Sequence, residues 1–128
     1  MAILKFEKYQ GNGNDFIIAN NQALTEWQIQ KVCDRNYGIG SDGYVNVFMD
    51  KDFVNIRFYN PDGSESFCGN GSRCALRFAE KHLNLKTQDQ FLAFDGIHSS
   101  ELLSDSVSIE MFVRAEIKPV QDFHFVNT

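Results

Sequence analysis

One short segment combines a thiol with backbone that side chains leave uncovered. In FCGNGSRCALRFAE, Cys68 is followed by Gly69, Asn70 and Gly71, and apolar residues then recur at helical spacing over residues 73–83. A helix is therefore predicted there, with Cys68 just before its start. The first amides of a helix lack partners and carry partial positive charge, so they stabilise a thiolate or bind a carboxylate. The segment indicates a thiolate base or nucleophile beside a carboxylate-binding turn, which glycine lets a ligand approach closely.

The cysteines are predicted to differ in role. For Cys68 the alternative is a buried structural cysteine beside a glycine turn, because free cysteine is among the most buried residue types. Its hydrophilic flanks weigh against that alternative. Cys74, one turn inside the helix, and Cys33, on the apolar face of an earlier helix, are predicted to be core residues. Cys68 and Cys74 are predicted not to form a disulfide, since six helical residues separate them by roughly 9 Å, beyond the limit of about 7 Å.

Other kinds of site are disfavoured by the sequence. GIGSDG, residues 38–43, matches G-x-G-x-x-G, but it follows a predicted helix and precedes a predicted strand, the reverse of a dinucleotide site. No metal is expected, because the cysteines and histidines form no C-x-x-C or H-x-x-x-H pair. No G-x-S-x-G elbow nominates a serine nucleophile, so the histidines are interpreted as surface or core residues.

Length and composition describe one globular domain. The chain has 128 residues, of which 43% are apolar, enough to form a core. Its formal net charge of -5 and the lack of a basic stripe argue against a nucleic-acid partner. No apolar run reaches the roughly 18 residues of a membrane span, and the first residues do not resemble a signal peptide. We therefore expect a cytoplasmic protein with no membrane association.

The elements that must position the cysteine segment are predicted from periodicity. Alternation predicts strands in residues 2–10, 15–20, 44–50, 53–60, 90–95, 97–103, 106–117 and 120–128. A helix is predicted from Glu26 to Tyr37, with Thr25 and Gln28 as a capping box and Gly38 as the C-cap. This order favours an α+β domain with a largely antiparallel sheet. Since the strand-like pattern continues to Thr128, the chain is expected to be a fragment.

Four segments together resemble diaminopimelate epimerases. They are KYQGNGNDFIIAN, DRNYGIGSDG, FYNPDGSESFCGNGSRCALRFA and the final FVNT, in that order. The resemblance implies a cofactor-independent enzyme that interconverts L,L- and meso-diaminopimelate for lysine and cell-wall synthesis. It also implies two similar domains, each a largely antiparallel sheet wrapped around a central helix, with the active site between them and one cysteine from each. Cys68 matches the first of these acid/base cysteines.

Further site residues follow from the same resemblance. Asn14 and Asn60 match substrate-binding asparagines, although turn chemistry alone favours a turn-stabilising role for each. The amides of Gly69, Asn70 and Gly71 are expected to face the substrate carboxylate. The resemblance implies that residues 1–128 form a single N-terminal domain. The second cysteine would lie in a C-terminal domain absent from this chain, so the isolated chain is expected to be inactive.

Alternative functions remain open at this stage. Another enzyme of the same two-domain group, similar to proline racemase or a phenazine-pathway isomerase, is one. A small amino-acid-binding module, using the turn after Cys68 as an anion site without chemistry, is another. The chain could also be an inactive half that pairs with a separate subunit or with a second copy as a homodimer.

Overall fold

The computed structural model describes residues 3–51, 53–85, 88–111, 117–120 and 123–126. The elements in chain order are β1 (Glu7–Gly11), β2 (Asn14–Asn20), α1 (Glu26–Cys33), β3 (Tyr44–Asp50), β4 (Phe53–Tyr59), β5 (Glu65–Ser66), α2 (Gly69–Leu83), β6 (Gln88–Ala93), β7 (Gly96–Leu102), β8 (Val107–Ile109), β9 (Ile117–Val120) and β10 (Phe123–Val126). Parts of three predicted strands lie outside the described residues: residue 2, residues 112–116, and residues 121–122 with 127–128.

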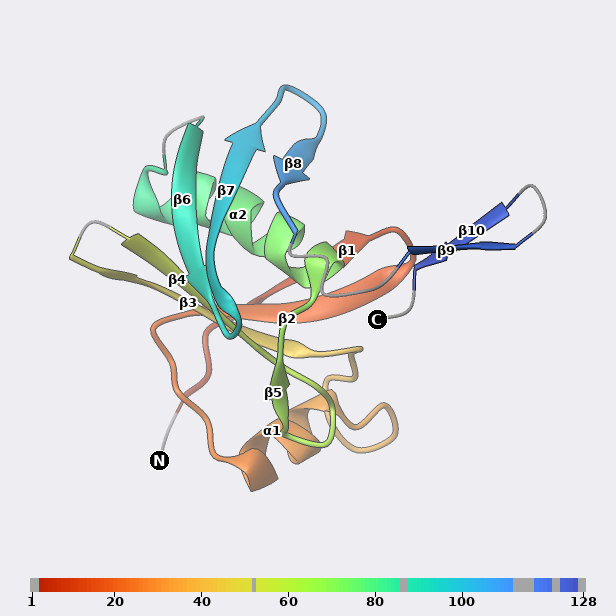
Figure 1. Cartoon of the computed structure of the whole chain (residues 1–128). Helices are drawn as coiled ribbons and strands as arrows, with labels where there is room; N and C mark the ends of the chain where they lie inside the picture. The colour runs from red at the N-terminus through yellow and green to blue at the C-terminus, as the bar shows by residue number, and fades with distance from the viewer. Residues whose placement is uncertain (1–2, 52, 86–87, 112–116, 121–122, 127–128) are drawn as a thin grey trace.

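A curled sheet surrounds helix α2, as Figure 1 shows. The strand order is β1-β2-β3-β4-β6-β7-β8, and the short β5 pairs with β4. Within this sheet, β2–β3 and β4–β6 are parallel and the other pairs are antiparallel. Each parallel pair is joined by a crossover that contains a helix, as parallel strands require. The predicted class, an α+β domain with a largely antiparallel sheet around a central helix, is confirmed.

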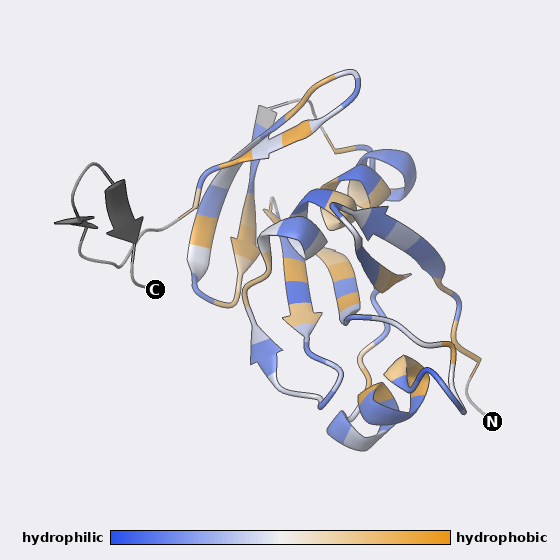
Figure 2. Cartoon of the chain, turned by 90° about the vertical axis from the view of Figure 1, so that its right-hand side faces the viewer, coloured by the Kyte–Doolittle hydropathy of each residue, from blue (hydrophilic) through white to orange (hydrophobic). Residues whose placement is uncertain are grey.

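The two faces of strands β2 and β3 contribute to two different apolar clusters. Phe16 and Ile18 belong to the main core, into which α2 inserts its apolar face. Ile17 and Ala19, one residue out of phase, pack with α1 on the other side. The strand β2 is therefore buried on both faces, and Figure 2 shows apolar and polar colours alternating along the strands near α2.

Helix α1 begins as predicted but ends earlier. The Thr25 hydroxyl accepts from the Gln28 amide at 3.2 Å and the Gln28 side chain accepts from the Thr25 amide at 2.8 Å, which confirms the capping box. The predicted end at Tyr37 is wrong, because the helix stops at Cys33. Asp34 has an extended ψ of 124°, and its carboxylate accepts from the amides of the second and third residues after it. This local turn replaces the predicted Gly38 cap.

Helix α2 begins at Gly69, earlier than the predicted 73–83, and ends at Leu83. Asn84 caps it in the left-handed conformation, with φ of 55°. Cys74 and Cys33 are buried, which confirms their predicted place in the core. In the described part of the chain, neither helix has the length and apolar character needed to cross a membrane.

Candidate active site

Cys68 is the N-cap residue of α2. Its backbone is extended, with φ of -133° and ψ of 117°, and its sulfur accepts from the Gly71 amide at 3.4 Å. The Cys68 carbonyl accepts from the Ser72 amide at 2.8 Å and so closes the first helical turn. The thiol is half-buried, unlike those of Cys33 and Cys74. The structure thus places the sulfur beside the first amides of the helix, which carry partial positive charge.

The glycines of the first turn allow close packing around this sulfur. A Cβ on Gly71 would lie 3.1 Å from Cδ2 of Phe58 and 3.5 Å from the Cys68 sulfur. A Cβ on Gly69 would lie 3.4 Å from the sulfur of Met111. Gly71 is therefore needed for the close approach of the helix to Cys68 and Phe58, whereas Gly69 borders a flexible side chain.

The side chains of two predicted substrate-binding residues, Asn14 and Asn70, meet beside this turn. The Asn70 amide nitrogen donates to the Asn14 side-chain oxygen at 2.9 Å. The Asn14 nitrogen in turn donates to Asp42 at 3.2 Å. The Asn70 oxygen accepts from Asn12 at 3.1 Å and also from Arg73. Because a carboxylate only accepts, Asp42 fixes which way the Asn14 amide faces.

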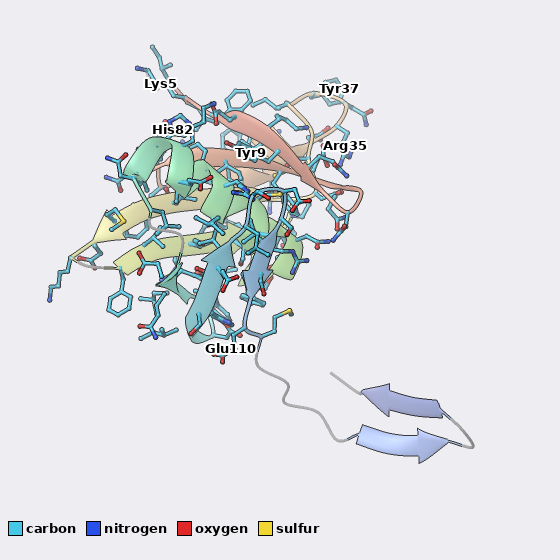
Figure 3. The ribbon with its side chains drawn as sticks, turned by 90° about the horizontal axis from the view of Figure 1, so that it is seen from above. Lys5, Tyr9, Arg35, Tyr37, His82 and Glu110 are labelled. Atoms are coloured by element: carbon cyan, nitrogen blue, oxygen red, sulfur yellow. The ribbon has the colours of Figure 1, made fainter. Side chains whose placement is uncertain are left out.

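Asp42 belongs to an ion-pair network that sequence reasoning missed. Arg35 bridges it to Asp15, with nitrogen–oxygen distances of 3.0 Å to Asp42 and 2.7 Å to Asp15. Arg35, together with Lys8, holds the pKa of the Asp15 carboxyl below its usual range. Figure 3 shows Arg35 close to the end of the β1–β2 hairpin that carries Asn14. The network residues Arg35 and Asp42 lie in DRNYGIGSDG, one of the segments that carry the family resemblance, but no local pattern in that segment predicts their pairing with Asp15.

Asn60 lies in the loop after β4. Its side-chain nitrogen donates to the Ser64 carbonyl at 3.2 Å and to the hydroxyls of Ser64 and Ser66, each at 3.1 Å. The loop packs against α1, where Gln30 donates to the Asp62 carbonyl at 2.9 Å. These bonds give Asn60 the turn-stabilising role considered above. They also tie it to Ser66, two residues before Cys68, and its contact with substrate stays a prediction.

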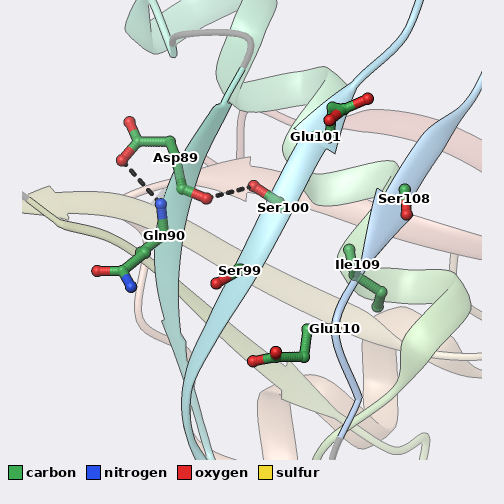
Figure 4. Close-up of a pocket in the computed structure, with 8 residues that line it drawn as sticks. All are labelled: Asp89, Gln90, Ser99, Ser100, Glu101, Ser108, Ile109 and Glu110. Carbon is green, nitrogen blue, oxygen red and sulfur yellow. Dashed lines mark hydrogen bonds between the residues drawn. The ribbon is translucent and has the colours of Figure 1, made fainter.

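Cys68 does not line either of two hollows in the described part of the surface. One of about 380 Å³ borders the other side of the α2 N-terminus and is lined by Asn70, Arg73 and Cys74 among others. A larger one of about 540 Å³ lies over β6, β7 and β8. Its lining is mainly serine and carboxylate, as Figure 4 shows. The proposed chemistry therefore rests on the helix terminus and its asparagines, not on the hollow over β6, β7 and β8.

Comparisons with known proteins identify relatives along most of the chain. A family model described as diaminopimelate epimerase matches residues 6–111. The diaminopimelate epimerase of Flavobacterium psychrophilum is 39% identical, over 98% of this chain and 52% of the relative. That of Acaryochloris marina is 38% identical, over 91% of this chain and 44% of the relative. The chain thus spans about half the length of these curated relatives.

Solved structures agree on the fold. A phenazine biosynthesis protein of the PhzF family from Enterococcus faecalis aligns with a TM-score of 0.64 and 13% identity, over 86% of this chain and 42% of that one. The Bacillus anthracis PhzF-family protein aligns with a TM-score of 0.58 and 20% identity, over 90% and 41%. At such low identity these similarities support the shared fold only, and the chemistry depends on the site residues.

Proposed function

Because the chain belongs to the diaminopimelate epimerase family, we propose that it forms part of an enzyme that interconverts L,L- and meso-diaminopimelate without a cofactor. The proposed setting is the cytoplasmic supply of lysine and peptidoglycan precursors. The observation that carries the proposal is the position of Cys68 as the N-cap of α2, with its sulfur 3.4 Å from the Gly71 amide.

Proton transfer at the α-carbon explains why a thiol would stand there. Inversion requires that one group remove the α-proton and that another return a proton from the opposite face. Cys68 is proposed as one of these groups, since the helix terminus favours its thiolate. Negative charge that develops on the substrate carboxylate would be stabilised by the amides of Gly69, Asn70 and Gly71.

The asparagines are proposed to orient the substrate. Asn14 and Asn70 are bonded to each other, so their amides form one polar surface beside the helix terminus. The direction of Asn14 is set by Asp42, which leaves its second N–H hydrogen and an oxygen lone pair for an amino or carboxylate group. Asn60 is proposed to contribute its side-chain oxygen, while its nitrogen holds the turn.

The second acid/base group is proposed to come from the part of the relatives that this chain does not span. Cys74 is unsuited to that role, because it lies on the same helix as Cys68 and is buried. Burial also raises the pKa of the Cys74 thiol, which disfavours the thiolate needed for proton abstraction. An acid/base group on the opposite side of the substrate is required instead.

The test is exchange of the α-proton of L,L-diaminopimelate in heavy water. This chain would be joined to the carboxyl-terminal half of the Flavobacterium psychrophilum relative, and deuterium uptake followed by mass spectrometry. We expect exchange that falls by about 100-fold or more in Cys68→Ala and persists in Cys74→Ala, the matched thiol control. The relative's half alone gives the background. Equal exchange with and without the Cys68 thiol would refute the proposal.

A further inference from the structure

The residue before Cys68 is held by a stack of three parallel rings. Phe67 stacks on His98, with centroids 4.5 Å apart and planes inclined by 6°. The other face of His98 stacks on Phe91 at 5.1 Å and 11°. His98 comes from β7 and Phe91 from β6, and both are fully buried. The segment that leads into helix α2 is thereby anchored to strands distant in the sequence.

Hydrogen bonds at both nitrogens fix the plane of the central ring. Nδ1 of His98 donates to the Glu110 carbonyl at 2.6 Å, and Nε2 lies 2.7 Å from a carboxylate oxygen of Asp95. A carbonyl only accepts, so Nδ1 carries a proton. Since an ionised carboxylate also only accepts, the contact between Nε2 and Asp95 must hold a second proton, on the ring or on the carboxyl. Both ring nitrogens of the buried His98 are therefore hydrogen-bonded.

If residue 98 contributed only to stability, a histidine would be a costly choice there. A fully buried polar ring must recover its lost hydration through hydrogen bonds, and an apolar side chain of similar size would fill the space without that requirement. The bonds that satisfy His98 prevent the ring from turning, so the Phe67 ring that lies flat on it has one defined orientation. Phe67 is joined directly to Cys68 through the backbone.

We propose that His98 is a positioning residue for Cys68, acting through the Phe67 ring. It holds the N-cap backbone in the extended conformation that brings the sulfur to the Gly71 amide. The catalytic importance of this positioning rests on the proposed function of Cys68. The positioning itself is a property of the thiol and is measurable without substrate.

The test measures alkylation of each cysteine by iodoacetamide, resolved by peptide mass spectrometry. In His98→Leu the Phe67 ring loses its stacking partner, so the Cys68 sulfur moves away from the Gly71 amide and its thiolate is less stabilised. We expect the Cys68 rate at about pH 7 to fall about three-fold or more, with a smaller change at about pH 10, where thiolate is abundant. His98→Phe keeps a flat ring without the two hydrogen bonds and should give an intermediate loss.

The matched control is His82→Leu. His82 also lies against an aromatic ring, that of Phe78 at 4.5 Å, but near the opposite end of α2. The His82→Leu variant should leave the alkylation rates of Cys68 unchanged. The melting temperature of every variant is measured as well, to show that each protein is folded. If the ratio of the Cys68 alkylation rates at the two pH values is unchanged in His98→Phe, the proposal is overturned. This test holds even if His98→Leu fails to fold.

A spectroscopic measurement tests the hydrogen bonds separately. Nitrogen-15 NMR of the unaltered chain should show two bonded protons at the His98–Asp95 pair. A single proton, on Nδ1 alone, would contradict the fixed ring. Because neither measurement uses substrate, the two proposals can fail separately. If the His98 variants alter alkylation of Cys68 without loss of α-proton exchange, the proposed function of Cys68 is refuted and the positioning role stands. If they leave alkylation of Cys68 unaltered, the positioning role is refuted and the proposed function stands.

Discussion

Gly69 and Gly71 lie in the same helical turn but have different neighbours. The Cβ that an alanine would add at 71 lies 3.1 Å from Phe58, a core residue that is only 5% exposed. The corresponding atom at 69 lies 3.4 Å from Met111, whose side chain is 51% exposed and can shift. Comparing alanine substitutions at the two positions therefore distinguishes the effect of limited space from the general preference of helices for alanine over glycine.

Gly71→Ala is expected to lower the free energy of unfolding by about 1–2 kcal/mol, because overpacking against Phe58 outweighs the gain in helix propensity. Gly69→Ala should be neutral or stabilise by up to about 1 kcal/mol. Urea denaturation of both variants, followed by circular dichroism, provides the measurement. Similar changes in the two variants would show that space beside Phe58 does not matter.

Sequence patterns predicted the core positions of side chains whose surroundings are set by residues nearby in the sequence. Cys33 and Cys74 could be assigned to the core because apolar residues surround them at helical spacing. The place of Cys68 just before a helix likewise followed from the periodicity after it, although that helix begins at Gly69, four residues earlier than predicted. His98 was interpreted only as a surface or core histidine, since its partners Phe67 and Phe91 lie on other elements. No local periodicity reports a stack formed by strand pairing.

The first strand and the end of helix α2 are joined by a charge cluster. Glu7 of β1 accepts from Lys81 at 2.9 Å and lies 3.0 Å from His82. Figure 3 shows His82 on the same side of the molecule as Tyr9 of β1. Lys81, with a further contribution from His82, lowers the pKa of Glu7 to about 2. The charged form of Glu7 is thus favoured by folding.

This cluster should make stability depend on acid pH. The folded pKa of Glu7 is about 2, below its ordinary value of 4.5, so its contribution is present above pH 4.5 and is lost as pH falls towards 2. Because Glu7 and Lys81 are partly exposed, we expect a loss of only about 1 kcal/mol, which Glu7→Gln removes. Denaturation across this pH window measures it. Glu80→Gln, at another acidic side chain near this end of the helix, should retain the parent's pH dependence; if it behaves like Glu7→Gln, the assignment to Glu7 is wrong.

Sequence reasoning located the elements better than it located their ends and partners. The capping box of α1 is a short-range pattern and was predicted correctly. The early stop at Cys33 depends on side-chain bonds from Asp34 that compete with helical ones, and periodicity does not report such competition. The parallel pairs β2–β3 and β4–β6 arise when the crossovers pack on the sheet, so they required the tertiary structure.

The chain spans about half the length of its relatives, and the position of its cysteines gives that fact a chemical consequence. Cys68 is proposed to offer an acid/base group to one face of a substrate carbon, and Cys74 is buried in the core on the same helix. We therefore expect that the 128-residue chain alone forms no meso-diaminopimelate from the L,L isomer above the uncatalysed rate, as measured by chiral chromatography.

The concentration of the chain provides the decisive control for this prediction. A second copy could bring a thiol to the opposite face only by association, so a rate produced in that way would rise as about the square of the chain concentration. Turnover that is proportional to concentration and lost in Cys68→Ala would mean that one thiol suffices, and it would contradict the two-face mechanism. Absence of turnover at every concentration, with a folded chain, places the second proton donor outside these residues.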